Sequence, residues 1–338
     1  MNLELIDKSF LIERCLNDEL FFAASVSFEE RSVFGGQWLV EQNIPISFVE
    51  IFDYNTKALP VEIAKKLRSE HAEQLQSISI HNNTKNIHPS ASTELRNVSK
   101  ELCGYAERSF VLIDITCFTR VHLISLASVL CETKPDLLKN IFFCYTEPES
   151  YGIDNKNRAG WKDTIIVPVG KPSSFRHEGH VRGIVLMGQD VERLSIALGE
   201  LEPATGCLIF SHTPFRPDFL RHKLEINKSI RDRLLSLRLP RWPMDTRSTD
   251  DCWIDTIIEI TDFKSLFAAT NAQILAAERD EGPVALYPFG PKTLSFAASL
   301  ILASQQQINA WAIYPIPDKY EVTYSRGART IHFMKINI

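Results

Sequence analysis

Short apolar runs recur along the whole chain, and most are followed by a polar stretch and then by a segment with helical periodicity. The runs are apolar on consecutive residues rather than on alternate ones, as in FVLI at 110–113 and VALY at 284–287. Strands that are apolar on both faces are typical of parallel sheets covered by helices on both sides. The sequence therefore predicts an α/β fold with parallel sheets. The runs lie at 19–26, 46–52, 110–115, 141–145, 183–187, 207–210, 284–287 and 310–314.

The length of 338 residues exceeds the usual size of one domain, so two domains are expected. Between about 152 and 182 the alternation of strands and helices weakens, and turn-forming residues gather. We expect an N-terminal Rossmann-like domain at 1–152, a linker at 153–182 and a C-terminal Rossmann-like domain at 183–338. The tail from 330 onwards is expected to form a closing edge strand.

The two halves of the chain match one another at three places, in the same order. An apolar run is followed first by Glu-Arg, next by a loop with one basic residue and a small-residue helix, and last by Tyr, Pro, an acidic residue and a second Tyr. The matches predict an internal duplication, with Arg31 and Arg193 on equivalent strand-to-helix turns. Arg120 and Lys292 are the equivalent basic loop residues. The matched segments are 30–31 and 192–193, 110–130 and 284–303, and 142–152 and 311–321.

The composition is that of an ordinary globular protein. Lys plus Arg is 37 against 42 for Asp plus Glu, so the net charge is -5 and any anionic ligand must meet a local basic patch. The seven Cys form no C-x-x-C pair, which favours reduced thiols in the cytoplasm. No apolar run approaches the length of about 18 residues that a membrane helix needs, so no membrane contact is expected.

Several familiar catalytic and cofactor motifs are absent from the sequence. It contains no G-x-G-x-x-G fingerprint and no G-x-x-x-x-G-K-[ST] loop, so neither a standard NAD enzyme nor a P-loop ATPase is expected. H-E-x-x-H, paired C-x-x-C and G-x-S-x-G are missing too. We therefore predict neither a cofactor nor a metal site.

Polar residues follow the apolar runs of the first half, where open α/β sheets bind ligands. Glu30 is a candidate acid, base or ribose-binding group, with Arg31 holding a carboxylate by a charged hydrogen bond. The alternative is that acidic residues stand there only because the helix dipole favours them. Asp114 ends a run of apolar residues and needs a partner if it is ionised, which makes it a second catalytic candidate. The alternative is a helix cap.

The second half offers a similar loop after the run at 207–210. Ser211, Thr213 and Arg216 suit a phosphate or a carboxylate, and His212 is a candidate acid or base. The alternative is a Ser/Thr turn closed by Pro214.

The loop at 289–293 carries the clearest anion-binding signal. Gly290 permits close approach of the backbone, Lys292 supplies a charge, and Thr293 is expected to cap the following helix, whose N-terminus attracts anions. An ordinary strand-to-helix turn is the alternative. Tyr314 and Arg326 follow the last runs and either stack on a base or pack a terminal loop.

Basic residues are concentrated between Arg221 and Arg247. We expect one long charged helix at 218–237 and a further helix at 255–278. Such a charged helix is usually a solvated face, and it is also the one surface suited to nucleic acid.

Five segments together resemble an uncharacterised bacterial α/β family associated with mobile-element and antiphage defence loci. They are SFEERS, FVLIDITCFTR, YTEPESYG, YPFGPKT and YPIPDKYEVTYSRG. The tandem layout also resembles the Rossmann-fold sensor domains that recognise cyclic oligonucleotides in CRISPR-associated proteins. The resemblances imply a nucleotide-recognition protein that acts as a sensor or as a subunit of an antiphage defence complex. Two alternatives stay open: an enzyme on nucleotides or nucleosides, either a hydrolase or a transferase, and a scaffold that docks a protein or nucleic acid on 221–247.

Overall fold

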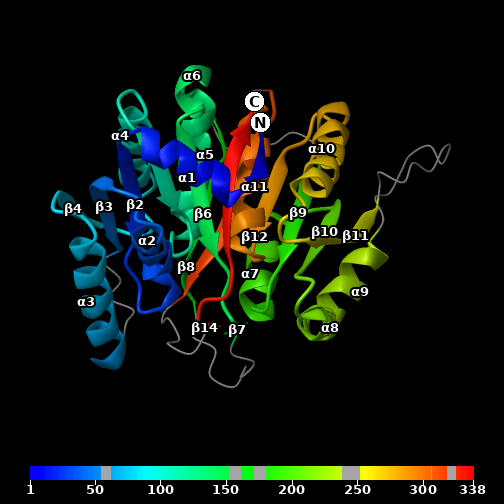
Figure 1. The fold of residues 1–338 in the computed structure, drawn as a ribbon. Helices are drawn as coiled ribbons and strands as arrows, with labels where there is room; N and C mark the ends of the chain where they lie inside the picture. The colour runs from blue at the N-terminus through cyan, green and yellow to red at the C-terminus, as the bar shows by residue number, and fades with distance from the viewer. Residues whose placement is uncertain (55–61, 152–160, 171–179, 238–251, 306, 318–324) are drawn as a thin grey trace. The chain divides into compact units, whose positions relative to one another are not determined.

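The computed structural model consists of two compact units (Figure 1). The N-terminal unit comprises 3–162 and 317–338, and the C-terminal unit comprises 163–316 together with 1–2. The structure describes residues 1–54, 62–151, 161–170, 180–237, 252–305, 307–317 and 325–338.

The described strands of the N-terminal unit form a seven-stranded sheet in the order β1-β15-β6-β5-β2-β3-β4. From β6 to β4 the neighbouring strands are parallel, whereas β15 is antiparallel to β6. The order β4-β3-β2-β5-β6 is the Rossmann order 3-2-1-4-5. The strands are β1 (Asn2–Ile6), β2 (Leu20–Ser25), β3 (Ile46–Tyr54), β4 (Asn82–Ile87), β5 (Phe110–Asp114), β6 (Ile141–Thr146) and β15 (Ile331–Asn337).

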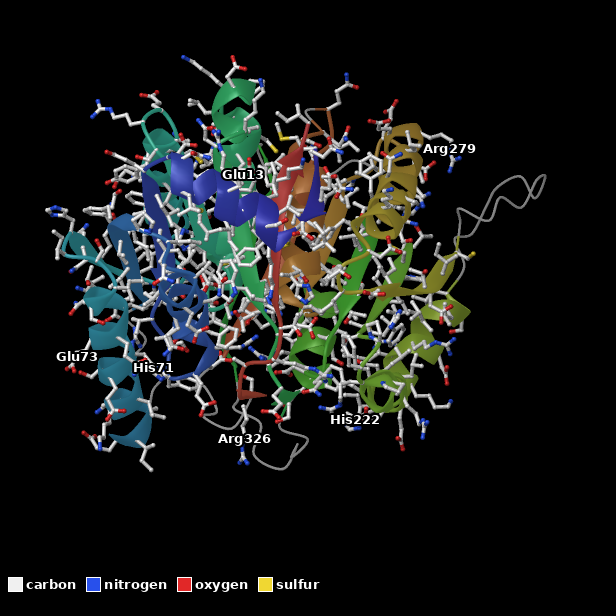
Figure 2. The ribbon with its side chains drawn as sticks, viewed as in Figure 1. Glu13, His71, Glu73, His222, Arg279 and Arg326 are labelled. Carbon is white, nitrogen blue, oxygen red and sulfur yellow. The ribbon has the colours of Figure 1, made fainter. Side chains whose placement is uncertain are left out.

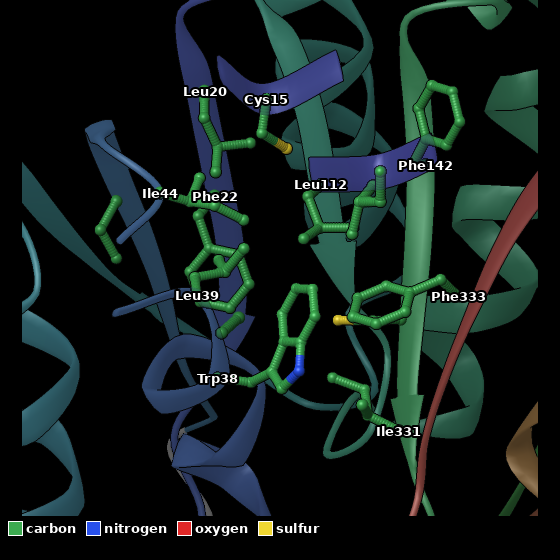
Figure 3. Packing of buried hydrophobic residues seen from close by; sticks show 14 of the residues in the cluster. Cys15, Leu20, Phe22, Trp38, Leu39, Ile44, Leu112, Phe142, Ile331 and Phe333 are labelled. Carbon is green, nitrogen blue, oxygen red and sulfur yellow. The ribbon is translucent and has the colours of Figure 1, made fainter. Parts of the chain in front are cut away.

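Helices cover both faces of this sheet because its central strands are apolar on both sides. Phe22 of β2 belongs to the core under the first three helices, while its neighbour Phe21 stacks on Tyr105 of α4 on the opposite face. Figure 3 shows Trp38 of α2 packed against Phe333 of β15, with ring centroids 4.6 Å apart. The helices are α1 (Lys8–Asn17), α2 (Arg31–Glu41), α3 (Glu62–Ser77), α4 (Ser92–Tyr105), α5 (Arg120–Glu132) and α6 (Pro135–Leu138).

The C-terminal unit repeats the same strand order. Its described strands form a six-stranded sheet in the order β11-β10-β9-β12-β13-β8, and β11 to β13 are parallel. Counted from β9, this is again 3-2-1-4-5, so the prediction of two Rossmann-like halves is confirmed. The strands are β8 (Trp161–Pro168), β9 (Arg182–Met187), β10 (Thr205–His212), β11 (Trp253–Glu259), β12 (Val284–Pro288) and β13 (Ala310–Pro317).

The helices of the C-terminal unit are placed by the same apolar patterning. Leu194 of α7 and Leu234 of α9 share one core with the buried strand residues Phe210 and Tyr287. The helices α10 and α11 pack against each other. The helices are α7 (Val191–Leu201), α8 (Pro217–Ile226), α9 (Lys228–Ser236), α10 (Phe263–Arg279) and α11 (Lys292–Ala303).

The structure differs from the sequence prediction in which sheet the strands β8 and β15 join. The strand β8 lies within the expected linker and joins the sheet of the C-terminal unit. The tail strand β15 joins the sheet of the N-terminal unit, between β1 and β6, so it is not an edge strand. Ile331 and Phe333 of β15 are buried in the N-terminal core, which explains this pairing (Figure 3).

Two expected helices also differ from the structure. The charged segment at 218–237 forms two helices, α8 and α9, which are separated at Asn227. The amide of Asn227 is buried and donates to the carbonyls of Gly188 and Lys223 at 2.9 Å. Residues 253–259, which were expected to be helical in part, form the edge strand β11 because they pair with β10.

Candidate functional site

The carboxyl ends of the parallel strands bring the candidate residues of each unit together. In both units the first Rossmann strand lies beside the fourth, β2 beside β5 and β9 beside β12, and this reversal of strand order is where such sheets bind ligands. Arg31 begins α2 directly after β2, and Arg193 lies in the first turn of α7 directly after β9. The two arginines therefore stand on equivalent turns, as the internal duplication predicts.

Arg31 is held in place on three sides. Its Nε donates to Glu29 Oε2 at 2.9 Å, and one terminal nitrogen donates to the carbonyl of Thr146 at 3.2 Å. The guanidinium carbon lies 5.9 Å from the centre of the Tyr145 ring, at the end of β6. Arg31 is only 3% exposed, so the ion pair with Glu29 is well shielded from water.

Arg193 repeats this arrangement in the C-terminal unit. Its Nε is paired with the carboxylate of Asp190, and its guanidinium carbon lies 5.9 Å from the centre of the Tyr314 ring. Tyr314 belongs to β13, the strand equivalent to β6, and its ring packs beside that of Phe289 with centroids 6.0 Å apart. Each unit thus presents a carboxylate, a guanidinium and a tyrosine ring beside its strand reversal.

Glu30 is engaged by a segment from the far end of the chain. The backbone N–H of Gly327 donates to Glu30 Oε2 at 3.1 Å, and the hydroxyl of Ser325 donates to Glu29. Ser325 and Arg326 form β14 (Ser325–Arg326), which pairs antiparallel with β7 (Ser150–Tyr151). Gly327 has φ +65°, a conformation that favours glycine.

The structure therefore brings Arg326 to the same strand ends as Glu30, although the sequence separates them by almost the whole chain. Arg326 is exposed, and Figure 2 shows its side chain projecting outward from β14. Sequence reasoning missed the role of Ser325 and Gly327, since nothing in a short polar segment indicates which distant carboxylate it will meet.

Asp114 is buried at the end of β5 and closes the loop before α5. Its Oδ1 accepts the N–H of Thr116 at 2.9 Å, and a Cβ on Gly35 of α2 would lie only 2.4 Å from its Oδ2. Asp114 does not cap α5, because the cap is Thr119, which accepts from the N–H of His122. Asp114 is 2% exposed, and its hydrogen bond to Thr116 holds the loop after β5 rather than a neighbouring strand end.

In the loop at 289–293 the structure confirms the close approach predicted for Gly290 but not the helix cap predicted for Thr293. Gly290 does make a close approach, because a Cβ there would lie 3.0 Å from the Cβ of Leu186 at the end of β9. Thr293 does not cap α11: it is fully buried and its hydroxyl donates to the carbonyl of Ile260 at 3.2 Å. The N-cap is Pro291, which makes no side-chain cap, and Lys292 is the first helical residue. The start of α11 therefore combines a cation with the helix N-terminus, and its N-cap residue supplies no side-chain cap.

The candidate residues in the loop after β10 differ in their burial and in their partners. Arg216 pairs with Asp218 at 3.0 Å at the start of α8. His212 ends β10 opposite Glu259 of β11, and the hydroxyl of Thr213 is buried without a hydrogen-bond partner. Ser211 is almost fully buried and touches Lys223 of α8, a residue that sequence reasoning missed.

Lys223 is a buried amine whose contacts are all neutral. Its Nζ lies 2.6 Å from Ser211 Oγ, donates to the Ser211 carbonyl at 2.9 Å, and sits 4.4 Å from the centre of the Phe219 ring. Burial lowers the pKa of this amine to about 7, because the charged form loses its hydration. A lysine on a charged helix is ordinarily solvated, so no sequence signal distinguished this one.

The basic segment between Arg221 and Arg247 is accompanied by acidic partners. Arg231 pairs with Asp255 of β11 at 2.5 Å, and Lys228 pairs with Asp232. Residues 238–251, including Arg247, lie outside the described part of the chain. Pairing of this kind weakens the argument for a nucleic-acid surface on α8 and α9.

Among the described residues, no group of three or more His, Cys, Asp or Glu side chains is arranged to hold a metal ion. None of the helices described is both long and apolar enough to cross a membrane.

Comparison with known proteins adds little to this geometry. No protein-family model and no curated protein matches the chain. One solved structure that is similar carries the description "Structure of a Type III CRISPR defence DNA nuclease activated by cyclic oligoadenylate". The TM-score is 0.41 at 10% sequence identity, and the match covers 87% of this chain and 65% of the other. A match at this level is a loose analogy of fold and assigns no function.

Proposed function

We propose that the chain recognises a nucleotide or another phosphate-bearing ligand at the carboxyl ends of its parallel strands. The observation that carries the proposal is the repeated contact of an arginine with a tyrosine ring, Arg31 with Tyr145 and Arg193 with Tyr314, at the same place in two Rossmann-like units. A guanidinium suits the oxygens of a phosphate, and a tyrosine ring suits the face of a base.

The loop after β12 supports the same chemistry. Lys292 stands at the start of α11, where the helix dipole favours an anion and where the N-cap residue Pro291 supplies no side-chain cap. A phosphate suits a helix N-terminus beside a lysine, which is why we assign the ligand a phosphate.

In the cell we propose the role of a sensor, or of a subunit in a bacterial antiphage defence complex. This finer assignment rests on the resemblance of the sequence segments and on the contacts that the candidate carboxylates make in the described part of the chain. Glu29, Glu30 and Asp114 are each engaged in structural hydrogen bonds, which favours recognition over catalysis.

The test is incubation of the full chain with a panel of mononucleotides, dinucleotides and cyclic oligonucleotides, followed by native mass spectrometry. Stable retention of one compound is the expected result. Arg193→Ala and Tyr314→Ala should each weaken its binding by about 10-fold or more, since each removes one contact to the ligand. Arg233→Ala on α9, an exposed residue, is the matched control and should bind like wild type.

Two outcomes would contradict the proposal. Retention of no compound in the panel would mean that the strand ends do not recognise nucleotides. Conversion of a compound into product would replace recognition by an enzymatic activity on nucleotides.

A further inference from the structure

Lys223 is the most unusual ionisable group in the described part of the C-terminal unit. It is 3% exposed, and none of its hydrogen bonds is to a carboxylate. A charged amine in such a place needs an anion, and a neutral amine gains only two hydrogen bonds to Ser211. An anion that reaches this amine would therefore stabilise its charged form.

The end of β10 and the loop after β9 carry polar groups that are suited to an anion. Ser211 and Thr213 bring hydroxyl groups from the end of β10, and the Thr213 hydroxyl has no hydrogen-bond partner. The side-chain amide nitrogen of Gln189, after the neighbouring strand β9, is likewise buried and unpartnered. Asn227 donates both to Gly188 and to the backbone of Lys223, so it ties the loop that carries Gln189 to α8.

Several titratable or charged groups lie on the elements packed against Lys223. His212 follows Ser211 on β10, and α8 itself carries Asp218, His222 and the exposed Arg221 and Glu225. Asp218 is paired with Arg216, and Asp190 of the neighbouring loop is paired with Arg193. The lowered pKa of Lys223 has burial as its cause, with no charged neighbour contributing. Protonation of this amine is thus governed by whatever anion comes to lie beside it.

We propose that Lys223, with Ser211 and Thr213, binds a phosphate group of the ligand at the end of β10, and that Lys223 takes up a proton when the phosphate binds. This inference rests on the proposed function and names the cation of that site in the C-terminal unit. Arg216, the cation that the sequence suggested for this loop, is committed to Asp218 instead.

The test is isothermal titration calorimetry of the full chain at pH 8 with AMP and, separately, with inorganic phosphate. Titration in buffers of different ionisation enthalpy gives the number of protons exchanged. At pH 8 both probes are already mainly dianions, and Lys223 is mainly neutral, since its pKa is about 7. We expect uptake of about 0.8 to 0.9 proton on binding if the bound dianion raises that pKa by about 2.

Two variants distinguish a specific role of Lys223 from a general effect of removing a lysine on binding and proton uptake. Lys223→Met should abolish the proton uptake and weaken binding by about 10- to 100-fold. Lys228→Met is the matched control, because Lys228 lies on α9, is exposed and pairs with Asp232, and it should bind and take up protons like wild type. Binding of AMP and phosphate alike would show that the phosphate is the group recognised, whereas binding of AMP alone would show that the nucleoside contributes as well.

The outcomes that overturn the inference differ from those that overturn the proposed function. If wild type binds a probe without proton uptake and Lys223→Met binds equally well, Lys223 is structural and the recognition of nucleotides stands. If wild type binds neither these probes nor any nucleotide of the panel, both conclusions fail. Proton uptake that persists in Lys223→Met would assign the titrating group to another residue and would also refute the inference.

Discussion

Replacing Lys223 by methionine should stabilise the C-terminal unit at neutral pH. Folding takes the amine out of water and lowers its pKa from 10.5 to about 7, so the folded state favours the neutral form. Each pH unit of this interval corresponds to about 1.4 kcal/mol, which gives a cost of burying Lys223 of at most about 5 kcal/mol at pH 7 and below. Methionine has a similar length, fits an apolar environment and carries no such cost.

The expected gain in the free energy of unfolding is smaller than the full cost of burying Lys223. The variant loses two hydrogen bonds to Ser211 and leaves the Ser211 hydroxyl unsatisfied. These losses cost about 2 kcal/mol, so Lys223→Met should raise the free energy of unfolding by roughly 2 to 3 kcal/mol at pH 7. Between pH 7 and 10.5 the unfolded chain binds a proton at Lys223 and the folded chain does not. Wild type therefore gains stability as the pH rises through this range, and the advantage of the variant should disappear near pH 9.

The assay is urea unfolding at pH 7.0, 8.0 and 9.5, followed by tryptophan fluorescence, to which the buried Trp253 and Trp311 of the C-terminal unit contribute. Lys228→Met serves as the control and should match wild type at every pH. The reasoning is refuted if Lys223→Met is no more stable than wild type at pH 7, or if its advantage does not change with pH.

Three further predictions concern the ligand loop, the core and the glycine contact. Lys292→Ala should reduce ligand binding by about 10- to 100-fold in a titration while the melting temperature changes little. Arg231→Ala on α9 should leave both binding and melting temperature nearly unchanged. The opposite pattern would show that the ligand binds on the basic helices α8 and α9 instead. Trp38→Ala should lower the free energy of unfolding by about 3 to 5 kcal/mol in urea denaturation, because Trp38 fills the core against β15, and a loss below about 1 kcal/mol would contradict this packing. Gly188→Ala should lower the free energy of unfolding by about 1 to 3 kcal/mol in the same assay, since its Cβ would lie 2.1 Å from the Phe289 carbonyl oxygen. An unchanged free energy of unfolding would show that the loop at 289–293 can move away from this Cβ.

The sequence by itself determined the class of fold and the repeat. Runs that are apolar on consecutive residues are a local property, and they predicted the parallel strands β2, β5, β9 and β12 close to their observed bounds. Because the duplication preserves the spacing between strand and helix, Arg31 and Arg193 were correctly placed on equivalent turns. Arg120 and Lys292 likewise proved to be the first residues of the equivalent helices α5 and α11.

Only the tertiary structure decided which distant segments meet. The tail strand β15 pairs with β6 across almost 190 residues of chain, and this pairing, together with β14, brings Ser325 and Gly327 to Glu29 and Glu30. Such long-range pairing depends on the side-chain packing of a whole core, and no local pattern encodes the partner.

The burial of Lys223 has the same origin. On the sequence it is one of several cations in a charged segment, but the break at Asn227 and the packing of α8 on β10 turn its amine toward Ser211. The ionisation of a side chain depends on the water and the charges around it, and these are set by neighbours that are remote in the sequence. Residue type and spacing therefore predicted candidate residues at the strand ends, and the folded structure alone showed which of the nearby cations is buried there.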